Sequence, residues 1–301
     1  MSFTEKAAAL ISRVYFWLEC LWRWFVPSLK SVENQVVVIT GAANGIGNEL
    51  ATRFSKMGAK LALLDINEFD CKTLCDELSA TGHVAVPFQC DVTNKEDMNK
   101  IGERIKNHPK LGFPDIVVAN AGIMKLAPIV DTSEAELQRH MDCNFYGVIN
   151  TFAPFVEEMI TRKRGHLVAT VSISAFTSLP LYCSYATSKA AINAYLECLL
   201  IEIGVRSNDT VKLTRIYPAT VQTSLTDPYP FIKNFLPIMT IDQVVNGMVK
   251  GILQEKWQCF IPWYHTLLVA VKFIIPECLM RPVLKLAGID LVILYNQNGK
   301  T

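Results

Sequence analysis

A run of four apolar residues, Val36 to Ile39, leads directly into a glycine-rich turn and then into a helical pattern. A continuous apolar run of this length predicts a strand that is buried on both faces, as in parallel sheets. The turn contains Gly41, Gly45 and Gly47, so the backbone can bend sharply and other groups can approach it closely. A buried strand, a glycine-rich turn and a helix in this order restrict the chain to an α/β fold.

The alternation of strand and helix patterns continues along the chain. Further strands are predicted at Leu61–Leu64, Val84–Gln89, Ile116–Ala119, His166–Val171 and Val211–Tyr217. Helices are predicted at Gly45–Met57, Asn67–Thr81, Asn94–His108, Glu134–Arg162 and Tyr185–Arg206. This succession predicts a Rossmann-like, doubly wound parallel sheet that binds ligands at the carboxyl ends of its strands. We expect a single domain over residues 31–256, with an apolar N-terminal helix (1–30) and an apolar helical tail (257–301) appended.

The glycine-rich turn predicts a dinucleotide site, because it follows a strand and opens a helix. Gly41 permits the tight turn, Gly45 lets the backbone approach a pyrophosphate, and Gly47 lets the helix lie close to the sheet. Asp65 ends the second predicted strand, eighteen residues after Gly47. A carboxylate there can accept hydrogen bonds from both ribose hydroxyls and repels a 2′-phosphate, so NAD is expected in preference to NADP. The alternative is that Asp65 only caps the following helix.

Proton transfer is suggested by Tyr185 and Lys189, four residues apart, with Ser172 thirteen residues before Tyr185. Residues four apart on a helix share a face, and a nearby positive charge favours the phenolate over its neutral form. Ser172 follows a predicted strand, so its hydroxyl can hold a substrate oxygen. The pattern predicts alcohol oxidation, in which Tyr185 takes the hydroxyl proton while the carbinol carbon gives hydride to nicotinamide. Ser174 is a rival for Ser172, but it lies only eleven residues before Tyr185.

Over about Glu33 to Lys256, these motifs resemble those of the short-chain dehydrogenase/reductase family. The resemblance implies catalytic roles for Asn144, Ser172, Tyr185 and Lys189, with Ser172 and Tyr185 also contacting substrate. It implies that the cofactor is bound by Gly41, Asn44, Gly45, Ile46, Gly47, Asp65, Asp91, Val92, Asn120, Ala121, Gly122, Tyr185, Lys189, Pro218, Val221 and Thr223. The chain departs from the family pattern at Ala175 and Ala219, where glycine is usual.

Within this family, the chain resembles the membrane- and lipid-droplet-associated branch, which includes the 17β-hydroxysteroid dehydrogenases types 11 and 13 and the epidermal-type retinol dehydrogenases. The similarity rests on the apolar N-terminal segment, on residues 63–67 and on the tail from Phe260 to Tyr295. It implies a place on the endoplasmic reticulum membrane or a lipid droplet, with the catalytic domain facing the cytosol. It also implies a homodimer formed through Phe145–Arg162 and Tyr185–Arg206.

The N-terminal residues 7–27 are rich in Trp, Phe and Leu, but Arg13, Glu19 and Arg23 interrupt them. Placed on a helical wheel, most apolar side chains share one half, which is typical of a helix lying in a membrane interface. The alternatives are a helix packed on the protein's own core and a true membrane span. The tail contains three prolines that break any long helix, so it reads as short helices that cover a substrate cavity or touch lipid.

Aromatic and proline residues crowd the segment after Thr223, namely Pro228, Tyr229, Pro230, Phe231, Phe235 and Pro237. With the apolar tail, this segment favours a lipophilic alcohol such as a retinol, a steroid or a fatty alcohol. The alternative is that these aromatic side chains pack on one another and contact no ligand. A different class of function is a lipid-surface structural or lipid-binding protein on a dehydrogenase fold with little turnover.

Charge and metal-ligand patterns exclude two other classes of function. The net charge is only +1, which argues against a nucleic-acid partner. The nine cysteines have no zinc-ligand or redox spacing and the five histidines do not cluster, so no metal site is expected. Scattered free thiols suit a cytosol-facing protein.

Overall fold

The computed structural model describes residues 29–229, 237–276, 278–279, 282 and 285. The chain divides into two compact units, residues 1–31 and 32–301, and the second unit carries the fold described below. The amphipathic helix predicted over 1–30 lies outside the described residues, apart from its last two positions. Among the residues described, no helix combines enough length and apolar character to cross a membrane.

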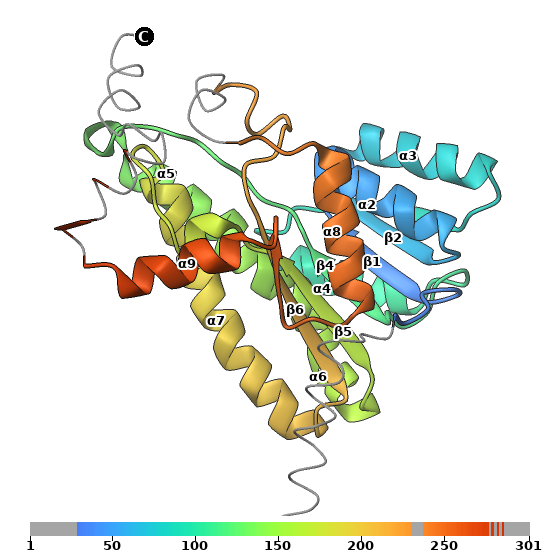
Figure 1. The fold of residues 1–301 in the computed structure, drawn as a ribbon. Helices are drawn as coiled ribbons and strands as arrows, with labels where there is room; N and C mark the ends of the chain where they lie inside the picture. Colours follow the sequence, from blue (N-terminus) through green and yellow to red (C-terminus); the bar gives the residue numbers. More distant parts are fainter. Residues whose placement is uncertain (1–28, 230–236, 277, 280–281, 283–284, 286–301) are drawn as a thin grey trace, which may run out of the picture. The chain divides into compact units, whose positions relative to one another are not determined.

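Seven parallel strands form one sheet in the order β3-β2-β1-β4-β5-β6-β7 (Figure 1). In chain order they are β1 (Val36–Thr40), β2 (Lys60–Asp65), β3 (Ala85–Gln89), β4 (Ile116–Ala119), β5 (Gly165–Thr170), β6 (Val211–Pro218) and β7 (Gln258–Ile261). The chain runs outward from β1 to β3 and then returns to β4 on the other side of β1. The sheet is therefore doubly wound, and its switch point lies between β1 and β4.

Helices cover both faces of the sheet. One layer contains α2 (Gly45–Lys56), α3 (Glu68–Ala80) and α8 (Ile241–Leu253), and the other contains α4 (Lys95–Lys106), α6 (Gly147–Arg162) and α7 (Cys183–Ser207) (Figure 1). Alternate residues of β1 point into the two layers: Val36 and Val38 join one core, whereas Val37 and Ile39 join the other. The continuous apolar run of this strand is thus explained by burial on both faces.

Asparagine side chains start the first three described helices at the carboxyl edge of the sheet. Asn44 accepts a hydrogen bond from the Gly45 amide, and Asn67 accepts one from the Asp70 amide. Asn94 accepts from two amides in the first turn of α4. Side-chain oxygens at this position satisfy N–H groups that have no partner within the helix. Each cap therefore fixes the turn between a strand and the next helix, where the cofactor was predicted to bind.

The single helix predicted over residues 134–162 is interrupted. Helix α5 (Glu134–Met141) passes into a π-helical turn, η2 (Asp142–Tyr146), before α6 begins at Gly147. A π-turn inserts one extra residue into the helical ladder and is frequent at functional sites. Hydrophobic periodicity does not reveal it, because the apolar pattern is continuous on both sides of the turn.

The sheet extends further toward the C-terminus than the sequence patterns indicated. Strand β7 pairs with β6 from Arg215↔Gln258 to Pro218↔Ile261, although residues 257–301 were set apart as an extension. Helix α8, which precedes β7, was not assigned from the sequence. After β7 comes α9 (His265–Ile274), which is joined to the body of the domain by a hydrogen bond from Lys272 to the carbonyl of Phe176.

Candidate active site

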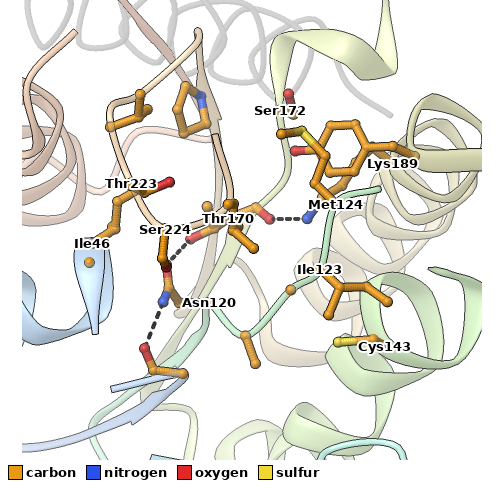
Figure 2. A pocket seen from close by; sticks show the side chains of 18 of the residues that line it. Ile46, Asn120, Ile123, Met124, Cys143, Thr170, Ser172, Lys189, Thr223 and Ser224 are labelled. Carbon is orange, nitrogen blue, oxygen red and sulfur yellow. Dashed lines mark hydrogen bonds between the residues drawn. The ribbon is translucent and has the colours of Figure 1, made fainter. Parts of the chain in front are cut away.

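A cavity of about 620 Å³ opens at the carboxyl edge of the sheet, where the turns after β1 to β6 meet. Every site residue predicted from the sequence lines it except Gly47 and Asn144. Figure 2 shows part of this lining, with Ile46 and Thr223 from the cofactor motifs together with Ser172 and Lys189. The two halves of the predicted site, far apart in sequence, therefore share one cavity.

Close packing dictates glycine at two positions of the first turn. A Cβ atom on Gly47 would lie 2.0 Å from the carbonyl oxygen of Gly41, well inside van der Waals contact. A Cβ atom on Gly41 would lie 2.9 Å from the Cα of Ala121, and Gly41 also has a φ of +65°. Helix α2 can therefore approach the sheet, and its first residues, Gly45 and Ile46, line the cavity, where a helix N-terminus favours an anionic pyrophosphate.

Asp65 lies at the end of β2 and joins two turns. Its Oδ2 accepts a hydrogen bond from the Ala43 amide, and its Oδ1 accepts one from the Asn67 amide, both at 2.9 Å. The cap of α3 is Asn67 rather than Asp65, so capping is not the role of this carboxylate. Because each carboxylate oxygen has a second lone pair and Asp65 lines the cavity, it can still accept hydrogen bonds from a bound ribose.

Asn120 connects the turns after three strands. Its Nδ2 donates to the carbonyl oxygens of Thr40 and Gly41, at 3.2 and 3.3 Å. Its Oδ1 accepts from the Thr170 hydroxyl at 3.1 Å, and the Thr170 carbonyl accepts from Lys189 Nζ at 3.0 Å (Figure 2). This chain of hydrogen bonds fixes Lys189 relative to the glycine-rich turn.

Lys189 and Tyr185 both line the cavity and lie next to each other. Lys189 is only 4% exposed, and this burial lowers its pKa to about 8. Its Nζ lies 5.8 Å from the centre of the Tyr185 ring. Burial raises the pKa of the Tyr185 phenol, and a hydrogen bond with Ser172 lowers it by less, so the net pKa is above the ordinary value.

The sequence pattern predicted that Lys189 and the positive charge of the nicotinamide together favour the phenolate, whereas the residues of the chain by themselves leave the Tyr185 pKa raised. The physical reason is burial of the phenol, which raises its pKa by more than Ser172 lowers it, while the Lys189 ammonium is directed to the Thr170 carbonyl. A further positive charge beside the phenol, such as that of an oxidised nicotinamide ring, is needed to favour the phenolate.

Asn144 does not line the cavity but lies directly behind its wall, wholly buried in the π-turn η2. Its Oδ1 accepts from the Ile123 amide at 2.9 Å, and its Nδ2 donates to the Ile123 carbonyl at 3.0 Å. The same Nδ2 donates to the Ser188 hydroxyl at 3.1 Å. The side chain thus fastens the β4–α5 loop to α7 next to Lys189.

The structure distinguishes between the two candidate serines. Both Ser172 and Ser174 line the cavity, and the Ser172 hydroxyl accepts a hydrogen bond from the Ser174 amide at 3.1 Å. Of the two serines, Ser172 is the one whose hydroxyl lowers the pKa of the Tyr185 phenol. Ser172 is therefore the hydroxyl that can hold a substrate oxygen and the tyrosine together.

Sequence patterns missed other residues that shape the site. Thr40 and Thr170 end β1 and β5 and carry the hydrogen bonds to Asn120. Their signal was a polar residue at the carboxyl end of a buried strand, which marks the ligand edge of such a sheet. Further lining comes from Met124, Arg139, Asp142, Cys143, Tyr182 and Leu225. Within the part of the chain that the structure describes, no group of His, Cys, Asp or Glu side chains is arranged to hold a metal ion.

Comparisons with known proteins agree with this arrangement. The sequence matches the "short chain dehydrogenase" family over residues 35–230. It is 28% identical to rat 17-beta-hydroxysteroid dehydrogenase 13 over 285 residues, covering 92% of this chain and 91% of the relative. Human estradiol 17-beta-dehydrogenase 11 is 30% identical over 265 residues, with 86% of each chain covered. Human epidermal retinol dehydrogenase 2 is 28% identical over 249 residues, covering 82% of this chain and 80% of the relative.

Solved structures show the same fold with nicotinamide cofactors bound. A short-chain dehydrogenase/reductase from Burkholderia phymatum in complex with NAD has a TM-score of 0.72 at 20% identity, over 87% of this chain and 98% of its own. A 3-oxoacyl-[acyl-carrier protein] reductase from Brucella melitensis with bound NAD has a TM-score of 0.68 at 26% identity, over 77% and 90% of the two chains. Since the family match spans most of the described sheet, the chain belongs to the short-chain dehydrogenase/reductase family, as an oxidoreductase that uses a nicotinamide dinucleotide.

Proposed function

We propose that this protein oxidises a lipophilic alcohol, such as a retinol, a steroid or a fatty alcohol, to its carbonyl with NAD, and can run the reverse reduction. The observation that carries the proposal is the convergence of Ser172, Tyr185 and Lys189 on the cavity that the glycine-rich turn also lines. When bound, the cofactor would supply the hydride acceptor. The residues of the chain would bind it, orient the alcohol and move the proton.

Each polar group has a defined task in this reaction. The Tyr185 phenolate takes the alcohol proton, and the Ser172 hydroxyl, which acts on the pKa of that phenol and lines the same cavity, holds the substrate oxygen. Lys189 steadies the phenolate electrostatically and can hydrogen-bond the nicotinamide ribose. The resemblance to the family implies that Asn144, which fastens the wall behind Lys189, holds a water that links to Lys189 in a proton relay.

The preference for NAD over NADP rests on Asp65. Its carboxylate is held at the rim of the cavity by two backbone amides and is not paired there with a cation in the described hydrogen-bond network. Such a group favours a ribose with free hydroxyls and disfavours an added phosphate, because two anions would lie together without an intervening positive charge. NADP would be the poorer cofactor.

A lipophilic substrate is supported by the apolar surroundings of Tyr185. Leu126, Leu181, Tyr182 and Ala186 form a buried cluster, and Tyr185, Met124 and Tyr229 pack against it. Tyr229 is held against this cluster, because its hydroxyl accepts a hydrogen bond from the Leu126 amide at 3.0 Å. The printed names of the relatives point to steroid and retinol as substrate classes.

We further propose that the protein binds the surface of the endoplasmic reticulum membrane or a lipid droplet, with its catalytic domain in the cytosol. The amphipathic pattern of residues 7–27 supports this, as do the exposed apolar side chains of α9 and the segment before it, Trp263, Leu267, Phe273 and Ile274. Deleting residues 1–30 is expected to move the protein from the membrane pellet to the soluble fraction. Unchanged pelleting would rule out an N-terminal anchor.

A homodimer through α6 and α7 is also proposed. Tyr195, Ile201 and Val205 are exposed on α7, where a second copy could cover them. Light scattering on the purified protein would report a mass near twice that of one chain.

The experiment that tests the proposed reaction is turnover of NAD with a panel of retinols, steroids and fatty alcohols, followed by identification of the product by mass spectrometry. The expected result is a carbonyl product and NADH in equal amounts with at least one of these alcohols. No turnover with any class, by protein that still binds NAD, would contradict the proposal.

A further inference from the structure

Three residues at four-residue intervals, Glu136, His140 and Asn144, hold the loop that follows β4 from behind. The Glu136 carboxylate pairs with Lys125 Nζ at 3.1 Å. The Lys125 amide donates to His140 Nε2 at 3.1 Å. Asn144 binds both the amide and the carbonyl of Ile123. Residues four apart lie on one face of a helix, so the three side chains form a column facing the loop.

His140 is wholly buried, and both of its ring nitrogens have partners that define their protonation. Nδ1 lies 2.9 Å from the carbonyl oxygen of Glu136, which can only accept a hydrogen bond, so Nδ1 carries the proton. Nε2 receives the Lys125 amide, which can only donate, so Nε2 is unprotonated. The network therefore selects the neutral imidazole with its proton on Nδ1, and a cationic ring would set two N–H groups against each other.

The charged groups near the His140 ring are paired with one another and do not oppose the neutral Nδ1–H tautomer. Lys125 and Arg139 both pair with the Glu136 carboxylate, at 3.1 and 3.5 Å. Partial burial raises the pKa of Glu136, but the hydrogen bond and charge of Lys125, together with Arg139, lower it to a net value below the ordinary one. The carboxylate, 3.5 Å from Nδ1, is thus neutralised chiefly by these two cations.

The column of Glu136, His140 and Asn144 also contacts Tyr185. The His140 ring packs edge-on against the Tyr185 ring, with 6.5 Å between centres and 77° between planes. Met124, which lies between the two fastened residues Ile123 and Lys125, lines the cavity. His140 thus contacts Tyr185, the proposed acid–base group, on one side and supports the cavity wall on the other. It does not itself line the cavity.

We propose that His140, as the neutral Nδ1–H tautomer, is a positioning residue that sets the Ile123–Lys125 wall against Tyr185 and so orients the alcohol for proton transfer. The expected effect on kcat rests on the proposed function. The tautomer of His140 and its hold on the loop do not. Misplacement of reacting groups by about 1 Å can slow a reaction roughly a hundredfold. Loss of a single amide contact is expected to cost about tenfold in kcat.

Two substitutions separate the hydrogen bond from the ring contact. His140→Phe keeps an aromatic ring beside Tyr185 but cannot accept from the Lys125 amide. His140→Gln removes the ring but offers an amide oxygen near the position of Nε2. We expect kcat to fall about tenfold in His140→Phe with the KM for NAD unchanged, and to recover to within about threefold of wild type in His140→Gln. Equal losses in both variants, or none in either, would overturn the proposal.

The matched control is His166→Phe. His166 is equally buried, but it lies on β5 and bonds Thr214 away from the cavity. This control is expected to lower the melting temperature while leaving kcat per folded molecule unchanged. A fall in kcat equal to that of His140→Phe would show that any buried histidine has this effect and would refute a specific role.

Two readouts do not depend on turnover. Hydrogen exchange of the Lys125 amide should quicken about tenfold in His140→Phe and stay slow in His140→Gln and in the control. Nitrogen-15 shifts of His140 in the wild-type protein should report a neutral ring protonated on Nδ1. A cationic ring or the other tautomer would overturn the inference even if His140→Phe does not fold. Absence of turnover in wild type, by contrast, would refute the proposed function and leave these two measurements decisive for His140.

Discussion

Replacing Asp65 by asparagine should weaken the discrimination against NADP. The substitution preserves the size of the side chain and removes its charge. The carboxylate is fixed at the cavity rim by the Ala43 and Asn67 amides, so it cannot swing away from an added phosphate in the wild-type protein. The repulsion is therefore expected to act on the bound cofactor in full.

The size of the effect follows from charge separation and exposure. Two like charges about 4 Å apart repel by about 1 kcal/mol in water and by about 4 kcal/mol at the effective dielectric of a protein surface. Asp65 is half-buried, which places the repulsion near 2 kcal/mol, or about thirtyfold in relative kcat/KM. The asparagine amide group would also face one backbone N–H without accepting from it, so the folded protein should lose about 1–3 kcal/mol of stability.

The assay is kcat/KM with NAD and with NADP at fixed alcohol, for wild type and for Asp65→Asn. The ratio of the two constants is expected to shift about thirtyfold toward NADP in the variant. Glu68→Gln is the matched control, because Glu68 is an exposed acid in the first turn of α3 and does not line the cavity. An unchanged ratio in Asp65→Asn, or an equal shift in the control, would refute the electrostatic reasoning.

Two further predictions concern the turn and the buried lysine. Gly47→Ala should abolish NAD binding and lower the free energy of unfolding by about 3 kcal/mol or more, because the new Cβ would lie 2.0 Å from the Gly41 carbonyl oxygen. Titration with NAD and denaturant unfolding measure the two effects. NAD binding as strong as in wild type would contradict the prediction. Lys189→Met should raise the free energy of unfolding at pH 7 by about 1–3 kcal/mol, because burial lowers the lysine pKa from 10.5 to about 8. Between pH 8 and about 10.5, Lys189 is deprotonated in the folded protein but still protonated in the unfolded chain. The free energy of unfolding of the wild type should therefore rise relative to that of the variant as the pH increases through this range. Parallel stability curves from pH 7 to 10 would contradict this assignment.

Local spacing explains why much of the site could be predicted from the sequence. Gly41 and Gly47 lie on one turn, and Tyr185 and Lys189 lie one helical turn apart, so neighbouring residues determine their relative positions. Asp65 ends its strand, and all strand ends of a parallel sheet lie at one edge. Short-range geometry and a single topological rule were sufficient to bring these residues to one edge of the sheet, where all of them except Gly47 line the cavity.

The features that escaped prediction depend on contacts between distant residues. Strand β7 has only four residues, and its assignment depends on pairing with β6 rather than on its own pattern. The column behind the β4–α5 loop required the π-turn and the path of that loop, neither of which periodicity reveals. The pKa of Tyr185 reflects the burial of its phenol and the nearness of Ser172, neither of which spacing alone determines.

The central claim is that Tyr185 transfers the proton while an adjacent nicotinamide accepts hydride, and Tyr185→Phe tests it most directly. The variant loses only the hydroxyl, so the fold and NAD affinity should match wild type. NADH formation with the best alcohol of the panel should fall by about a hundredfold or more, the contribution expected of a positioned acid–base group. Undiminished NADH formation by Tyr185→Phe would contradict the account.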